Sequence, residues 1–85
     1  MGAYSVLITR SAEREIERLP TPMRRLVVRR IEALSGDPRP QGSQKLAGED
    51  KYRVRQGDYR VIYLIDDEAG QVTIYKIGHR KEVYR

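Results

Sequence analysis

Three arginines in the segment 51–63 are spaced so that they could bind one anion together. The segment reads KYRVRQGDYRVIY, in which tyrosine and valine alternate with basic residues at the period of two that is typical of β-strands. The Gly-Asp pair at 57–58 predicts a two-residue hairpin turn, because glycine adopts the positive φ that such turns require. That turn pairs Arg55 with Arg60 and leaves Arg53 on the same face. Like charges directly opposite each other destabilise a sheet, so the spacing predicts an anion site; the alternative is a solvated basic face.

The end of the sequence carries the other residues that could take part in chemistry. It reads GHRKEVYR, and His79 is the only histidine of the chain. Its imidazole is the only side chain that ordinarily titrates near neutral pH. A surface histidine without a role is the alternative for a single residue of this kind. Gly78 is expected to let the backbone leave the preceding strand.

Composition restricts the class of protein. At 85 residues the chain is expected to form a single domain, 1–85, and it contains no cysteine for disulfides or thiolate metal sites. No metal-ligand constellation is seen, and no cofactor is expected. There is no signal-peptide pattern or membrane-spanning apolar run, which predicts a soluble, cytoplasmic protein without a membrane partner. Seventeen basic residues, thirteen of them arginine, give a net charge of +5 and favour a polyanion or an acidic protein as partner.

The first half of the chain predicts one strand and two helices. Residues Ala3–Thr9 have the alternation of a short strand, and Thr9 or Ser11 can cap the helix that follows. Thr21 is the expected N-cap of the second helix with Pro22 in its first position, and Gly36 is expected to cap its end. The apolar stripes comprise Ala12, Ile16 and Leu19 in the first helix, and Met23, Leu26, Val27, Ile31 and Leu34 in the second.

The second helix also carries Arg24, Arg25, Arg29 and Arg30 on its remaining surface. These residues could contact nucleic acid, but the pattern favours a solvated helix face that attracts an acidic partner. The two short-linked helices are expected to form an antiparallel hairpin.

The second half predicts strands. A long connection, Gly36–Asp50, has Leu46 as its one sizeable apolar anchor and leads into the hairpin. After the turn Asp66–Gly70, Gln71–Ile77 is a further strand, and the strand before that turn is expected to be buried on both sides and central. The order β-α-α-β-β-β defines an α+β fold: a largely antiparallel sheet with an N-terminal helical hairpin packed on one face.

Taken together, these motifs resemble the RelE/ParE toxin superfamily, and in particular the RelE branch of mRNA-cleaving toxins from type II toxin–antitoxin pairs. The resemblance rests on the Arg-x-Gly-Asp-Tyr-Arg-x-x-Tyr run, the Gly-His-Arg-x-x-x-Tyr ending, the N-terminal strand and the Leu-Pro break between two helices. It spans nearly the whole chain. It implies the RelE-like, microbial-ribonuclease-type fold.

The resemblance also implies an activity and its partners. RelE-type toxins are metal-independent endoribonucleases (mRNA interferases) that inhibit translation by cutting mRNA in the ribosomal A site. The substrate's 2′-hydroxyl is the nucleophile, and a small RelB-like antitoxin wraps and inhibits the toxin. The expected partners are therefore a RelB-like antitoxin, the ribosome with its 16S rRNA, and mRNA. Two other classes remain open: a ParE-like toxin that binds DNA gyrase and cuts nothing, and a binding module that only docks an acidic or amphipathic partner helix.

The resemblance assigns roles by motif position. Arg60 matches the phosphate-clamping arginine, Arg80 a proposed acid, and Tyr84 the tyrosine that stacks on or orients the scissile nucleotide. Arg53 and Arg55, with Lys51, are expected to bind RNA phosphates.

One departure from the family affects the expected mechanism. Arg53 and Arg55 stand where relatives have lysines, and arginine stays protonated, so neither is suited to be the general base. His79, whose neutral form a positive field favours, is then the expected base, with Tyr84 as a second option.

Overall fold

A computed structural model describes residues 3–46 and 50–79 of the chain. The elements follow the order β1 (Ser5–Ile8), α1 (Arg10–Glu17), α2 (Thr21–Ala33), β2 (Gln44–Lys45), β3 (Lys51–Gln56), β4 (Tyr59–Asp66) and β5 (Gln71–His79). The predicted α+β class is confirmed. The short strand β2, which lies within the long connection, is an addition to the predicted order. Neither helix of the described residues is long and apolar enough to cross a membrane.

The strands form one sheet in the order β1-β5-β4-β3-β2. Only β1 and β5 are parallel; every other neighbouring pair is antiparallel, as predicted. The strand β4 is central in this order. Its apolar residues are not all covered, however, because Ile62 is buried whereas Leu64 on the same face is 36% exposed.

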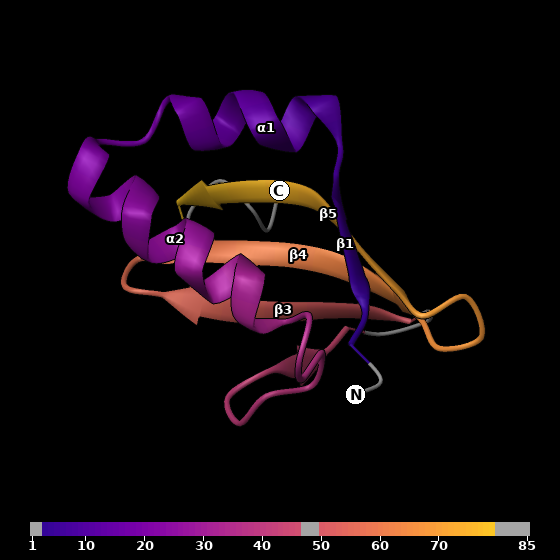
Figure 1. The fold of residues 1–85 in the computed structure, drawn as a ribbon. Coiled ribbons are helices and arrows are strands. Elements are labelled where there is room, and N and C mark those ends of the chain that lie inside the picture. Colours follow the sequence, from indigo (N-terminus) through magenta and orange to yellow (C-terminus); the bar gives the residue numbers. More distant parts are fainter. Residues whose placement is uncertain (1–2, 47–49, 80–85) are drawn as a thin grey trace.

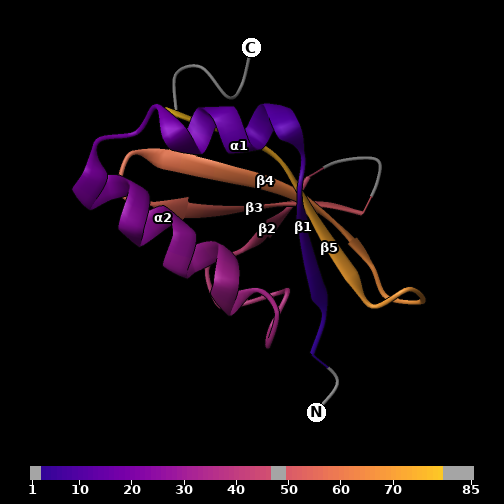
Figure 2. The same ribbon diagram turned by 45° about the horizontal axis from the view of Figure 1, so that its top comes forward.

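The helices cover one face of the sheet. Figures 1 and 2 show α2 crossing in front of β3 and β4, while α1 runs beside β5. The core between the layers combines apolar helix residues with the sheet residues that alternate toward them: Ala12, Ile16, Leu19, Val27, Ile31 and Leu34 from the helices and their ends, with Tyr52, Val54, Val61, Tyr63, Ile65, Val72, Ile74 and Ile77 from the sheet. The opposite face of the sheet carries the predicted arginines.

The helix ends confirm one local prediction and correct two. Thr9 caps α1 as expected, because its hydroxyl accepts a hydrogen bond from the Ala12 backbone N–H at 3.2 Å. In α2 the N-cap is Pro20, whereas Thr21 is already helical and its hydroxyl accepts from Arg24 at 3.0 Å. Gly36 is not a left-handed cap: the helix ends at Ala33, and none of the positive-φ glycines is Gly36.

Two further sequence expectations differ from the structure. Leu26 is 42% exposed, because the buried stripe of α2 runs through Val27 and Ile31 and leaves Leu26 on its flank. The strand β5 does not end before Gly78. It continues to His79 because the ladder with β4 extends that far.

Candidate phosphate-binding site

The hairpin between β3 and β4 sets the geometry of the site. Arg55 pairs with Arg60 and Gln56 with Tyr59, so the loop is the two-residue turn that the sequence predicts, with Gly57 at φ +63°. Since side chains alternate along a strand, Arg53, Arg55 and Arg60 stand on one face, away from α2. The predicted register is confirmed, and we call these three residues the arginine cluster.

Two members of the arginine cluster are buried, which is rare for charged residues. Arg53 is 9% exposed and Arg60 is 6% exposed, whereas Arg55 reaches solvent. The guanidinium of Arg53 donates a hydrogen bond to the side-chain carbonyl of Gln44 in β2. Burial and, to a lesser extent, the charge of Arg55 lower the pKa of Arg53. Arginine nonetheless stays protonated at neutral pH, so the cluster is a source of fixed positive charge.

A pocket of about 420 Å³ opens beside the cluster, at the edge of β3. Arg53 and Arg55 line it from β3, Gly42, Ser43 and Gln44 from the preceding loop and β2, and Arg30 from α2. We call it the β3-edge pocket. None of the described residues that line it is acidic. Sequence reasoning missed Arg30, Ser43 and Gln44, because nothing in their local pattern indicates that the chain brings them to the hairpin.

Lys51 lies on the same face as the arginine cluster but at its far end. It is four residues from Arg55, which corresponds to about 13 Å along a strand. Its ammonium group lies 5.6 Å from the centre of the Tyr75 ring, a cation–π distance. Lys51 is therefore grouped with Tyr75 rather than with Arg55 and Arg60.

His79 is not on the face of the arginine cluster. Its pairing partner is Tyr59, whereas Gly78 is the residue opposite Arg60. The imidazole and the Tyr59 ring meet edge to face, with centroids 5.8 Å apart. Both line a second pocket of about 670 Å³ together with Glu15 of α1, two residues that follow α1, and other residues of β5. The predicted residues Arg80 and Tyr84 lie outside the described residues.

The loop that supplies Gly42 and Ser43 is held at two points. The hydroxyl of buried Tyr63 donates to the Pro38 carbonyl at 2.7 Å. Arg39 forms an ion pair with Asp67 at 2.8 Å and donates to the Tyr52 hydroxyl at 3.1 Å. Both contacts join the loop to the sheet and so determine where the β3-edge pocket lies.

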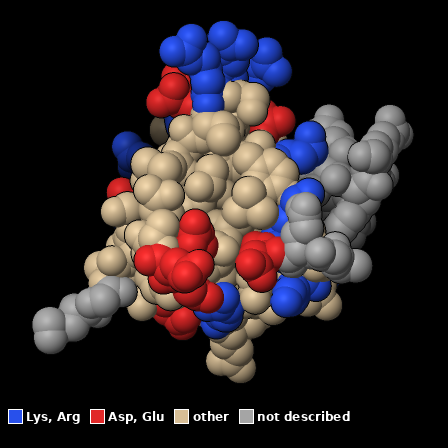
Figure 3. Space-filling view, turned by 90° about the vertical axis from the view of Figure 1, so that its right-hand side faces the viewer, with Lys and Arg blue, Asp and Glu red and all other residues tan. Residues whose placement is uncertain are grey.

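Acidic residues gather at the other end of the sheet. Asp66, Asp67 and Glu68 follow β4 at the turn into β5, and together with Asp50 they line a hollow of about 580 Å³. Figure 3 shows acidic side chains clustered on that side of the molecule. Asp66 is six residues from Arg60, which corresponds to about 20 Å along the strand. No group of three potential metal ligands occurs in the part of the chain that the structure describes.

Comparison with known proteins places this chain and its fold among bacterial and archaeal toxins. A family model described as the ParE toxin of type II toxin–antitoxin systems (parDE) matches residues 6–84. Toxin RelG of Mycobacterium tuberculosis is 36% identical over 86 residues, covering 96% of this chain and 97% of the relative. Toxin RelE of the same organism is 36% identical over 84 residues, covering 96% and 87%.

Solved structures agree with that result. The archaeal RelE–RelB complex from Pyrococcus horikoshii contains a chain that is 30% identical, with a TM-score of 0.85, covering 95% of this chain and 99% of that one. The RelBE2 toxin–antitoxin complex of Mycobacterium tuberculosis gives 33% identity and a TM-score of 0.80, covering 92% and 99%. The chain belongs to the RelE/ParE superfamily of toxins of type II toxin–antitoxin systems, on its RelE side by sequence and fold.

Proposed function

We propose that this toxin is a ribosome-dependent endoribonuclease that cleaves mRNA in the ribosomal A site and thereby inhibits translation. The observation that carries the proposal is the arginine cluster. Arg55 and Arg60 are directly paired across a hairpin, and Arg60 is almost fully buried. A fold that keeps like charges together in this way gains from a bound anion, and a phosphodiester is the anion that a RelE-like toxin would meet.

The cleavage that we propose is an internal transesterification. The 2′-oxygen of the substrate attacks the adjacent phosphorus, the bond from phosphorus to the 5′-oxygen breaks, and the products are a 2′,3′-cyclic phosphate and a 5′-hydroxyl end. A base must take the 2′-hydroxyl proton and an acid must protonate the departing oxygen. Arg55 and Arg60 would stabilise the negative charge that develops on the phosphoryl oxygens, with Arg53 holding the phosphate.

The proton-transfer roles belong to the end of the chain in this proposal. Arg80 is the proposed acid on the family pattern. For the base, Tyr84 stands ahead of His79, because the His79 imidazole shares the helix-side face with Tyr59 rather than the face of the arginine cluster. Lys51 would bind RNA phosphate beyond the cluster.

We further propose a RelB-like antitoxin as the cognate partner, and the ribosome with its 16S rRNA as the place of action. Support for the antitoxin comes from the two similar solved structures named above, both of which are complexes of a toxin with its antitoxin. The net charge of +5 suits both an acidic protein and rRNA.

Binding to DNA gyrase without cleavage is the second candidate function, because the matching family model is described as a ParE toxin. The two functions place different demands on Arg60. A nuclease needs its charge at the scissile phosphate, whereas a gyrase-binding protein does not.

Cleavage of mRNA on programmed ribosomes tests the proposal. Arg60→Ala should lower the cleavage rate by about 10²–10³-fold, the usual cost of losing a group that stabilises transition-state charge. Arg25→Ala removes an exposed arginine from α2 and serves as the matched control that keeps the wild-type rate. Intact mRNA with the wild-type toxin, together with inhibition of gyrase, would replace the nuclease assignment with the ParE-like one.

A further inference from the structure

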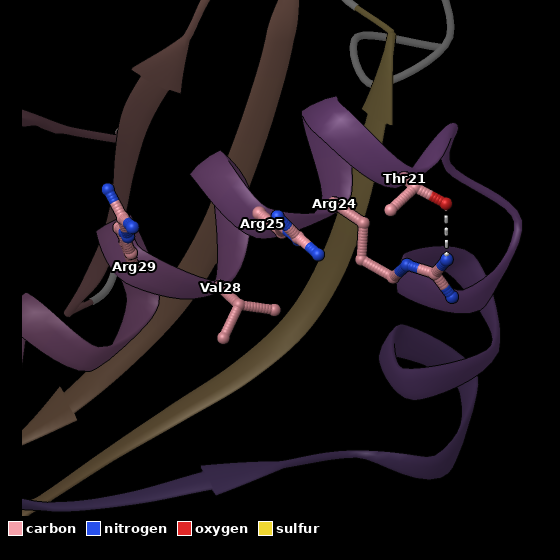
Figure 4. Close-up of a pocket in the computed structure, with 5 residues that line it drawn as sticks. All are labelled: Thr21, Arg24, Arg25, Val28 and Arg29. Carbon is pink, nitrogen blue, oxygen red and sulfur yellow. Dashed lines mark hydrogen bonds between the residues drawn. The ribbon is translucent and has the colours of Figure 1, made fainter.

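Arg30 does not share the environment of the other arginines of α2. Arg24, Arg25 and Arg29 line a separate surface hollow with Thr21 and Val28, where Arg24 bonds to the Thr21 hydroxyl (Figure 4). Arg30 instead lines the β3-edge pocket with Arg53 and Arg55. Two successive arginines of one helix, Arg29 and Arg30, therefore serve two different surfaces.

The backbone of the loop lies next to the Arg30 guanidinium. Gly42 adopts φ +93°, and a Cβ at that position would lie 3.8 Å from an Arg30 terminal nitrogen. Ser43 follows, its backbone N–H bonded to the Pro40 carbonyl at 2.9 Å. The loop thus closes one side of the pocket around Arg30, and a side chain larger than glycine would be strained there.

The hydrogen bonding of Arg30 is incomplete within the described residues. Its Nε is buried, and residues 3–46 and 50–79 provide no acceptor for it. A buried N–H without an acceptor is costly, so a ligand that supplies an acceptor would be favoured here. Among the described residues, the lining of the pocket has three guanidiniums and no carboxylate. An anion in the pocket would give the Arg30 Nε an acceptor.

We propose that the β3-edge pocket is a second phosphate subsite, in which Arg30 binds a backbone phosphate of the RNA next to the scissile one. The inference rests on the proposed nuclease function and extends it. Arg53 and Arg55 belong both to the arginine cluster and to this pocket, so the two anion positions are adjacent. A guanidinium fork matches phosphate oxygens in two-point contacts, which would fix the direction in which the strand leaves the cluster.

RNA is favoured over a protein carboxylate because of where the pocket lies. Successive phosphates of a single strand can occupy the arginine cluster and the pocket in turn. The role assigned to Arg30 is in binding and positioning, since it lies beside the cluster rather than in it.

The test uses the full-length toxin and a short, 2′-O-methylated single-stranded RNA that cannot undergo 2′-hydroxyl attack. Arg30→Gln should weaken binding about 10-fold at low salt, the loss expected for one charge-assisted contact. It should also reduce the slope of log affinity against log salt by about 0.7, the value for one phosphate on a single strand. Arg29→Gln removes the same charge from the neighbouring residue, and it should leave both quantities close to wild type.

Two further measurements separate binding from folding. Arg30→Lys keeps the charge but loses the two-point contact of the guanidinium. It should restore the wild-type slope of log affinity against log salt, but only part of the affinity. In the wild-type protein, the NMR signal of the Arg30 Nε–H group should shift on adding the RNA, whereas that of Arg29 should not. Cleavage on ribosomes is measured separately, so a wild-type toxin that binds RNA through Arg30 but cuts no mRNA would refute the nuclease proposal alone.

Three results would overturn the subsite. The first is equal losses in Arg29→Gln and Arg30→Gln, which indicate a general charge effect. The second is wild-type RNA binding by Arg30→Gln. The third is normal RNA binding with weakened antitoxin binding, which would assign the pocket to a protein carboxylate.

Discussion

Replacing Tyr63 by phenylalanine tests how the loop before β2 is held in place. Tyr63 has no exposed surface, and its hydroxyl donates to the carbonyl of buried Pro38 at 2.7 Å. Tyr63→Phe keeps the ring and its stacking on Tyr52, whose centroid is 6.0 Å away. The change therefore leaves a buried carbonyl without its partner but creates no large cavity.

The expected loss of stability is about 1–2 kcal/mol, within the range for a buried polar group that loses its only hydrogen bond. For a domain of this size that corresponds to a fall in melting temperature of roughly 4–15 °C. Tyr59→Phe, in the same strand and on the same face but half-buried, should change stability by less than about 0.5 kcal/mol. Denaturant unfolding of the two variants beside the wild type measures the difference.

The buried Tyr63 hydroxyl also predicts that stability falls at alkaline pH. Burial raises the pKa of Tyr63 to about 12, whereas the unfolded value is about 10. The folded state thus holds the phenolic proton more tightly, and the stability from this group is present below pH 10 and lost between pH 10 and about 12. Tyr63→Phe should remove this loss of stability between pH 10 and about 12. Equal stability of Tyr63→Phe and Tyr59→Phe, with an unchanged alkaline limb, would refute the anchoring role.

Three other predictions concern the acidic end, the turn and the mechanism. Arg39 and the Tyr4 hydroxyl lower the pKa of Asp67, so its contribution to stability is present above about pH 4 and is lost as the pH falls. In denaturant unfolding, Asp67→Asn should therefore lose less stability at acidic pH than the wild type. Gly57→Ala places a side chain at φ +63° and should cost about 1–2 kcal/mol, whereas Gly36→Ala, at an ordinary φ, should be neutral or slightly stabilising in the same assay. For His79→Gln, the sequence alone predicts a loss of cleavage of about 10²–10⁴-fold, as for a general base. The observed register instead predicts that His79→Gln lowers the cleavage rate by less than about 10-fold. An inactive His79→Gln variant whose residual rate no longer rises with pH would restore His79 as the base.

The sequence alone determined every element except β2, as well as the face of the arginines. The Gly57-Asp58 turn fixes the loop length, and the period of two then decides that Arg53, Arg55 and Arg60 share a face. The Thr9 cap and the α+β order are local or nearest-neighbour features as well. In each case, the residues that determine the structure lie within a few positions of one another.

Only the tertiary structure decided which distant residues join that face and which do not. Arg30 has the same local pattern as Arg29, and packing of α2 against the sheet alone brings it to the β3-edge pocket. The strand β5 passes Gly78 because β4 continues to pair with it, and this one additional pair turns His79 toward Tyr59. Periodicity within a segment cannot predict these outcomes, since they depend on how far a partner strand extends and on how a helix is rotated on the sheet.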